Sequence, residues 1–127
     1  MRDAREWATA NDDPRSTNFV VEVDGEFAGG AGYERFQAER RFSAEIGYWL
    51  GRRFWRRGIA TAALNAISEF AFASEDIVRL EAGAHSNNPA SQRVLEKCGF
   101  QREGVLRRAV VKGDEMLDIV MYAKIRE

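Results

Sequence analysis

The fold of this chain is decided by the stretch from Ala44 to Leu64, which reads AEIGYWLGRRFWRRGIATAAL. Its first part belongs to a segment from Phe42 to Leu50 that we expect to form a strand, paired antiparallel with the strand before it. In Gly58 to Ala73 the apolar positions recur at spacings of three and four, so they share one face of a helix. The stretch therefore predicts a strand that leads into the longest helix, with arginines at the turn between them.

Turn residues and hydrophobic spacing predict the segments on either side. Upstream, we expect a short helix over Asp3 to Ala10 and a hairpin in which Asp24-Gly25 joins strands Asn18 to Val23 and Glu26 to Phe36. Downstream, we expect a strand over Arg79 to Ala84, a helix over Pro89 to Cys98 followed by Gly99 as its C′ residue, and strands over Phe100 to Val111 and Met116 to Ile125. The chain shows no internal repeat or linker, so residues 1–127 are predicted to form a single domain.

Composition excludes several kinds of site. The chain holds 19 Lys plus Arg against 20 Asp plus Glu, a formal net charge of -1, so it has no global attraction for nucleic acid or anionic lipid. Cys98 is the single cysteine and His85 the single histidine, which excludes an internal disulfide, a multi-cysteine zinc site and a multi-histidine metal centre. No apolar stretch approaches the roughly 20 residues that cross a bilayer, and the N-terminus lacks a signal-peptide core, so we expect a cytoplasmic protein without a metal.

Four arginines lie within six positions before the long helix, in the run Arg52-Arg53-Phe54-Trp55-Arg56-Arg57. A helix N-terminus offers unpaired backbone N–H groups and a partial positive charge, and the small residues Gly58 and Ala60 leave those amides open to a phosphate. One interpretation is a pyrophosphate-binding loop. The other is that the arginines coat a solvated turn while the small residues pack the helix on the sheet.

Two phosphate-binding motifs are absent or incomplete. The chain has no P-loop sequence, so a P-loop nucleotide site is unsupported. The run Gly29-Gly30-Ala31-Gly32 lacks the spacing and the following helix of a dinucleotide fingerprint, and we expect it to serve strand packing.

The stretch Ala44 to Leu64, together with NPASQRVLEKCGFQREGVLRR from Asn88 to Arg108, resembles the GNAT acetyltransferases, and most of all the branch that acetylates ribosomal-protein N-termini. The resemblance runs from about Asp3 to the C-terminus. It implies acetyl-CoA as the donor, with its pyrophosphate on a loop made of Arg52, Arg53, Trp55, Arg56, Arg57, Gly58, Ile59, Ala60 and Thr61. It also implies that backbone groups of Tyr48, Trp49 and Leu50 run beside the pantetheine arm, that Asn88 holds that arm and that Ser91 lies near the sulfur.

For the fold, the resemblance implies an α/β (α+β) domain with a mixed, mostly antiparallel sheet of about six strands, flanked by helices and splayed between the third and fourth strands at the acetyl-CoA site. For function, it implies an N-acetyltransferase that acts on a primary amine, either a protein N-terminus or a small amine, by direct attack through a tetrahedral intermediate. Two rival functions are a CoA-binding module or sensor without turnover, and RNA docking by the arginines, which the acidic remainder of the chain disfavours.

The chain departs from the family at both common proton-transfer positions. Leu95 stands where many GNAT enzymes have a tyrosine acid, and Val110 where some relatives have a glutamate base. Glu45 is the remaining candidate base and Ser91 the candidate acid; the alternatives are a solvated or salt-bridged strand residue and a helix-surface hydrogen bonder. At neutral pH, deprotonation costs about 1 kcal/mol for an α-amine and about 4.6 kcal/mol for a lysine, so a weak base favours α-amines as acceptors.

Several other residues are assigned mainly structural roles. Cys98 lies at a helix C-terminus, where the helix dipole raises a thiol pKa, so we expect it to be structural. His85 is expected to be a polar loop residue rather than a proton relay. Trp49 and Phe36 are candidates to line the acceptor groove.

The resemblance also bears on how complete the acceptor site is. Relatives usually begin with a further strand and helix before the part that Asp3 matches. We therefore expect that the groove is open, that a second subunit completes it in a homodimer, or that the chain is a shortened version of a longer product. Asp118 and Tyr122 lie on one strand face and resemble the family's last strand.

Overall fold

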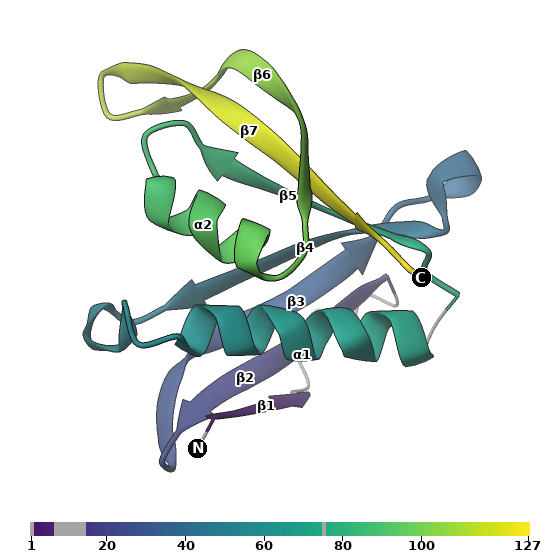
Figure 1. The fold of residues 1–127 in the computed structure, drawn as a ribbon, viewed down its shortest axis with the longest axis vertical. Helices are drawn as coiled ribbons and strands as arrows, with labels where there is room; N and C mark the ends of the chain where they lie inside the picture. The colour runs from purple at the N-terminus through teal and green to yellow at the C-terminus, as the bar shows by residue number, and fades with distance from the viewer. Residues whose placement is uncertain (1, 7–14, 75) are drawn as a thin grey trace.

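The computed structural model describes residues 2–6, 15–74 and 76–127, which form one mixed seven-stranded sheet and two α-helices (Figure 1). The strands have the spatial order β1-β2-β3-β4-β5-β7-β6, and each neighbouring pair is antiparallel except β4 and β5, which run parallel. The strands are β1 Arg2–Glu6, β2 Ser16–Val23, β3 Glu26–Arg35, β4 Ser43–Leu50, β5 Arg79–His85, β6 Gln101–Lys112 and β7 Glu115–Ile125. The helices are α1 Ile59–Ser74 and α2 Pro89–Lys97, with short 3-10 turns η1 Ala38–Arg40 and η2 Arg52–Phe54.

The predicted fold class is confirmed, and from residue 15 onward each predicted element lies within two residues of its observed bounds. The helix expected over Asp3 to Ala10 is wrong for residues 3–6, which belong to β1 instead, and β1 raises the strand number from about six to seven. The remaining residues of that predicted helix lie outside the described ranges. Pairing with the open edge of β2 outweighs the helix preference of this segment, because a helix of so few residues is only marginally stable on its own.

Asp24 and Gly25 form the two-residue turn of the β2–β3 hairpin. Their φ angles are 52° and 84°, and a type I′ turn needs left-handed backbone at both of these positions. The hairpin predicted from this dipeptide is confirmed.

The glycine-rich run in β3 lets neighbouring strands approach closely. A Cβ added at Gly29 would overlap the backbone oxygen of Trp49 in β4, and one added at Gly32 would overlap that of Thr17 in β2. These glycines serve strand packing, as predicted.

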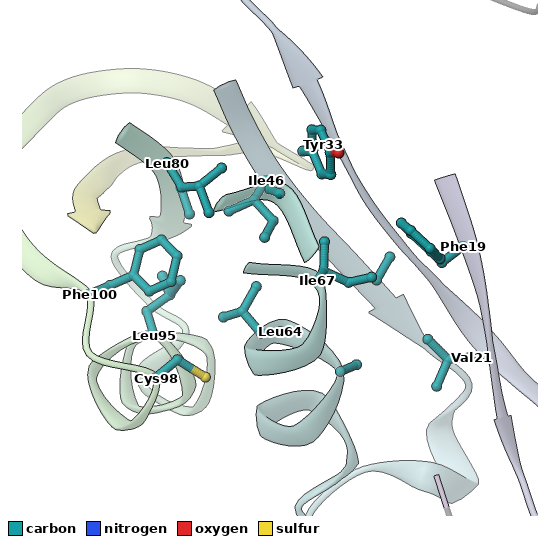
Figure 2. Packing of buried hydrophobic residues seen from close by; sticks show 14 of the residues in the cluster. Phe19, Val21, Tyr33, Ile46, Leu64, Ile67, Leu80, Leu95, Cys98 and Phe100 are labelled. Atoms are coloured by element: carbon teal, nitrogen blue, oxygen red, sulfur yellow. The ribbon is translucent and has the colours of Figure 1, made fainter. Parts of the chain in front are cut away.

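The core lies between the two helices and one face of the sheet (Figure 2). Along α1, four predicted core residues at a spacing of four are at most 5% exposed: Ile59, Ala63, Ile67 and Ala71. Phe70, predicted on the same face, is 38% exposed and packs edge-on against Phe19 of β2, with ring centroids 5.1 Å apart. Figure 2 shows Leu64 of α1 beside Leu95 of α2, so the same cluster holds both helices on this face. Among the described residues, no helix is both long and apolar enough to span a bilayer.

β4 and β5 pair only from Ser43↔Arg79 to Glu45↔Glu81 and then separate (Figure 1). Beyond this point β4 stays paired with β3 as far as Leu50, and β5 stays paired with β7 as far as His85. Within the described part of the chain, each strand thus presents to the other an edge without a strand partner. This confirms the predicted splay between the third and fourth predicted strands.

Candidate active site

The N-terminus of α1 opens onto the loop that carries the arginines. Arg56 and Gly58 have φ angles of 61° and 73°, and this left-handed backbone turns the chain out of β4 and into the helix. The Ala62 amide donates to the Gly58 carbonyl at 3.1 Å, which makes Gly58 the first acceptor of the helix. The amides of residues 58–61 therefore lack intrahelical acceptors, and together with the helix dipole they suit an anion.

Contacts on either side of the arginine loop fix it against the end of β4. The Trp55 indole donates to the Leu50 carbonyl at 2.9 Å, and the guanidinium of Arg52 lies 5.7 Å from the Trp55 ring centroid. Arg53 donates to Glu26 of β3 at 2.8 Å, so part of its charge is already compensated. All four arginines of the loop are exposed to solvent.

The predicted pantetheine-contacting residues occupy the end of β4 next to this loop. Tyr48 and Leu50 pack against the core on the helix side of the sheet, while Trp49 is 54% exposed on the other face, with its ring 5.6 Å from that of Phe27. Because β5 has already diverged, the β4 backbone offers an edge to which an extended ligand can hydrogen-bond. The arginine loop, residues 52–57, thus follows directly after the β4 edge. Both lie on the β4 side of the opening between β4 and β5.

Asn88 and Ser91 lie at the start of α2, which follows the other strand of the opening. Asn88 is the N-cap: its Oδ1 accepts from the Ser91 amide at 3.1 Å, and its own amide donates to the His85 carbonyl at 3.0 Å. This capping leaves the NH₂ of Asn88 to contact a ligand. Ser91 is half-buried in the first turn of the helix, so the structure brings these two predicted residues together on the β5 side.

Glu45 lies on the sheet face opposite the helices, in an open groove of about 430 Å³. Within the described part of the chain, no side chain hydrogen-bonds to or ion-pairs with its carboxylate, so the carboxylate is open to solvent and to a ligand in the groove. Trp49 lines this groove, and Phe36 lines an adjoining one of about 310 Å³. The two residues predicted to line an acceptor groove therefore lie along one continuous concave surface that includes Glu45.

The sequence did not point to Glu34, which lies directly opposite Glu45 in the β3–β4 ladder and lines both grooves. A loop of several residues joins these strands, so no short turn reveals their register. Arg15 lies 3.6 Å from Glu34 and offsets part of its charge. Two neighbouring carboxylates make this surface suited to a cationic amine.

Cys98, Leu95 and Tyr122 are all buried in the hydrophobic core. Cys98 is 3% exposed, its Sγ donates to the Thr61 carbonyl at 3.4 Å, and burial raises the pKa of its thiol. Leu95 is 2% exposed in the core, so the family's tyrosine position supplies no acid. Tyr122 is 1% exposed and donates to Glu96 at 3.1 Å; burial first, and this bond second, raise the pKa of its hydroxyl.

Asp118 holds the turn between β5 and α2 against β7. Its Oδ1 accepts from the Arg108 amide at 2.7 Å, and its own amide donates to the Ser86 hydroxyl at 3.2 Å. The Ser86 amide in turn donates to the Asp118 carbonyl at 2.9 Å. Among the described residues, no group of three or more His, Cys, Asp or Glu side chains is arranged to hold a metal ion.

β4 and β5 separate, and the cationic N-terminus of α1 lies at the end of β4, an arrangement suited to an extended ligand that carries a diphosphate. The chain belongs to the GNAT acetyltransferase family, since the model of the acetyltransferase (GNAT) domain matches residues 1–101. The family predicted from the sequence is confirmed.

Relatives with curated names and with solved structures agree with this assignment. The chain is 30% identical over 109 residues to the uncharacterized N-acetyltransferase p20 of Bacillus licheniformis, a match that covers 86% of this chain and 61% of that protein. It is 31% identical over 107 residues to the ribosomal-protein-serine acetyltransferase of Escherichia coli strain K12, covering 84% and 59%. Among solved structures, RimL, a ribosomal L7/L12 alpha-N-protein acetyltransferase in complex with coenzyme A, superposes with a TM-score of 0.82 at 26% identity, covering 89% and 63%.

The relatives include the ribosomal-protein branch that the sequence resembles. RimJ of Mycobacterium smegmatis, in complex with CoA-disulfide, has a TM-score of 0.80 at 34% identity, covering 87% of this chain and 53% of that one. The chain spans about three-fifths of the length of p20 and of the Escherichia coli acetyltransferase.

Proposed function

We propose that this protein is an N-acetyltransferase that moves an acetyl group from acetyl-CoA to a primary amine. The observation that carries the proposal is the opening between β4 and β5, with the N-terminus of α1 and its arginines at the end of β4. Family membership supports the same chemistry.

The residues around the opening suit acetyl-CoA. The amides of residues 58–61 and the exposed arginines would hold the pyrophosphate, and the backbone of residues 48–50 would pair with the pantetheine arm, assisted by the NH₂ of Asn88. The residues we propose to contact the donor are Tyr48, Trp49, Leu50, Arg52, Arg53, Trp55, Arg56, Arg57, Gly58, Ile59, Ala60, Thr61, Asn88 and Ser91. When bound, acetyl-CoA supplies the acetyl group as a thioester whose thiolate is a good leaving group.

The groove on the opposite face would hold the amine. Glu45 and Glu34 attract the ammonium form, and Glu45, alone or through a water, takes the proton that the nitrogen loses as it attacks the thioester carbonyl. The Ser91 hydroxyl donates a hydrogen bond to the departing sulfur. Holding the two reactants together can itself lower the barrier by about 7–11 kcal/mol, so weak proton-transfer groups suffice.

An α-amine is the acceptor that this arrangement favours. The candidate base Glu45 is exposed, and the about 1 kcal/mol that deprotonates an α-amine at neutral pH is far below the cost for a lysine side chain. Ribosomal-protein acetyltransferases among the relatives support a protein N-terminus as the acceptor.

Thiol release from acetyl-CoA tests the proposal. The protein is mixed with acetyl-CoA and a panel of N-terminal peptides, polyamines, aminoglycosides and amino acids, and CoA binding is titrated alongside. We expect acceptor-dependent thiol release, fastest with an α-amine. Glu45→Gln should slow it without loss of CoA affinity, and Ser91→Ala should slow it by more than CoA affinity falls.

The alternative function is a CoA-binding module or sensor without turnover. Burial of Leu95 at the position where many GNAT enzymes have a tyrosine acid favours this alternative. CoA binding without acceptor-dependent thiol release for any amine in the panel would support the module and contradict the enzyme.

A further inference from the structure

Glu81 of β5 is a buried carboxylate that the proposed mechanism does not use. It is 8% exposed and accepts hydrogen bonds from Arg40 of η1 and from Arg79, the latter at 2.9 Å. Arg79 also donates two hydrogen bonds, of 2.6 and 3.0 Å, to the Glu103 carboxylate of β6. A carboxylate is costly to bury unless it is paired. The charge-assisted hydrogen bonds from Arg40 and Arg79 therefore stabilise Glu81 in its buried position.

Arg40 connects this buried carboxylate to the wall of the groove. Its guanidinium carbon lies 4.2 Å from the centroid of the Phe36 ring, a cation–π distance, while the same guanidinium bonds to Glu81. Phe36 and Gln37 line the groove of about 310 Å³ that also includes Glu34 and Glu45. Arg40 therefore joins the groove wall to β5 at Glu81, the last residue of β5 that pairs with β4.

We infer that Arg40 is a positioning residue for the amine acceptor: its bond to Glu81 and its contact with Phe36 hold the segment 36–41, whose first two residues line the acceptor groove. The inference rests on the proposed function, because the groove matters only if an amine binds there. Arg40 itself is not proposed to touch acetyl-CoA or the reacting atoms.

The contacts around the segment explain why loss of Arg40 should move the wall without unfolding the sheet. Glu81 keeps Arg79 as a partner, so its charge stays compensated. The ends of the segment also stay attached, since the Phe36 amide donates to the Ser43 carbonyl at 3.0 Å and Arg35 donates to the Arg41 carbonyl at 2.7 Å. Loss of the Arg40 guanidinium therefore removes only the link from Phe36 to Glu81, which we call the tether.

Steady-state kinetics of the full chain test the inference, with Arg40→Gln, Arg40→Lys and the matched control Arg41→Gln. Arg41 lies in the same segment and is exposed, but it stacks on Phe42 and bonds within the loop. We expect Arg40→Gln to raise the acceptor KM about fivefold with kcat and acetyl-CoA affinity nearly unchanged. Arg40→Lys, which keeps the ion pair, should recover part of that loss, and Arg41→Gln should resemble the unaltered protein.

Hydrogen exchange, which needs no substrate, tests the tether separately. The amides of Arg40 and Arg41 bond to the carbonyls of Gln37 and Ala38 at 3.0 and 3.1 Å, and both should exchange faster in Arg40→Gln. An unchanged acceptor KM in Arg40→Gln, or an equal rise in Arg41→Gln, would overturn the inference. Absence of turnover in the unaltered protein would overturn the proposed function and the acceptor role with it, while faster exchange would still support the tether.

Discussion

Arg56→Gly should separate the charge of the arginine loop from the stability of the fold. Arg56 has a φ of 61°, and left-handed backbone costs a residue with a side chain roughly 1–2 kcal/mol. Glycine removes that cost, but it adds about 0.5–1 kcal/mol of conformational entropy to the unfolded chain. The side chain is exposed, so little packing is lost. The net change in unfolding free energy is expected to stay within about 1 kcal/mol, a shift in Tm of no more than about 5 °C.

The same substitution removes one positive charge beside the N-terminus of α1. Two unit charges about 4 Å apart interact by about 1 kcal/mol in water, so CoA affinity should fall about fivefold at low ionic strength. The loss should be smaller at physiological salt, where exposed charges are screened. Calorimetric titration with CoA at both ionic strengths, together with thermal melts, measures both quantities.

Arg53→Gln is the matched control for this charge effect. Arg53 already pairs with Glu26 at 2.8 Å, so its loss should weaken CoA binding less than the loss of Arg56. Unchanged CoA affinity in Arg56→Gly at low salt would refute the reasoning about charge. A fall in Tm well beyond about 5 °C would refute the reasoning about strain.

Three further predictions concern the core, one surface ion pair and the cysteine. Leu64 is 1% exposed, so Leu64→Ala should lower the unfolding free energy in urea by roughly 2–5 kcal/mol, more than Phe70→Ala at a 38% exposed position; equal losses would contradict the packing described. Hydrogen bonds from Arg79 lower the pKa of Glu103, so the stabilisation by this pair is fully present above the ordinary carboxyl pKa of about 4.3 and is lost as pH falls through the lower folded value. The difference in Tm between the protein and Glu103→Gln should therefore shrink from about pH 7 to about pH 3, and a constant difference would count against the pair. Burial raises the pKa of the Cys98 thiol, so a disulfide-exchange reagent should label Cys98 slowly in the native protein and completely in denaturant, whereas rapid native labelling would show that the thiol is accessible.

Local signals were sufficient for most elements of the fold. The Asp24-Gly25 turn depends only on the conformations of its own two residues. The spacing of Ile59, Ala63 and Ile67 likewise predicts a buried helix face from a single segment. β1 has no comparable signal, because its place is decided by the free edge of β2, a partner distant from it in the sequence. The helix-like composition of that segment therefore misled the prediction.

The proposed donor site and the proposed acceptor surface differ in how well they can be predicted from the sequence. The arginine loop and the start of α1 are contiguous, so their arrangement at a helix N-terminus could be predicted from one run of residues. The acceptor surface is assembled across elements. Glu34 meets Glu45 through a ladder whose register is not encoded in a short turn, and Arg40 meets Glu81 across 41 positions of sequence. No local pattern reports contacts of this kind.

The proposed function depends above all on the binding of the CoA pyrophosphate by the amides at the start of α1. A crystal structure of this chain with CoA bound tests it most directly. We expect diphosphate oxygens within about 3 Å of the backbone nitrogens of residues 58–61, with the pantetheine arm along the β4 edge in the opening beside β5. A diphosphate bound elsewhere, with these amides facing only solvent, would contradict it.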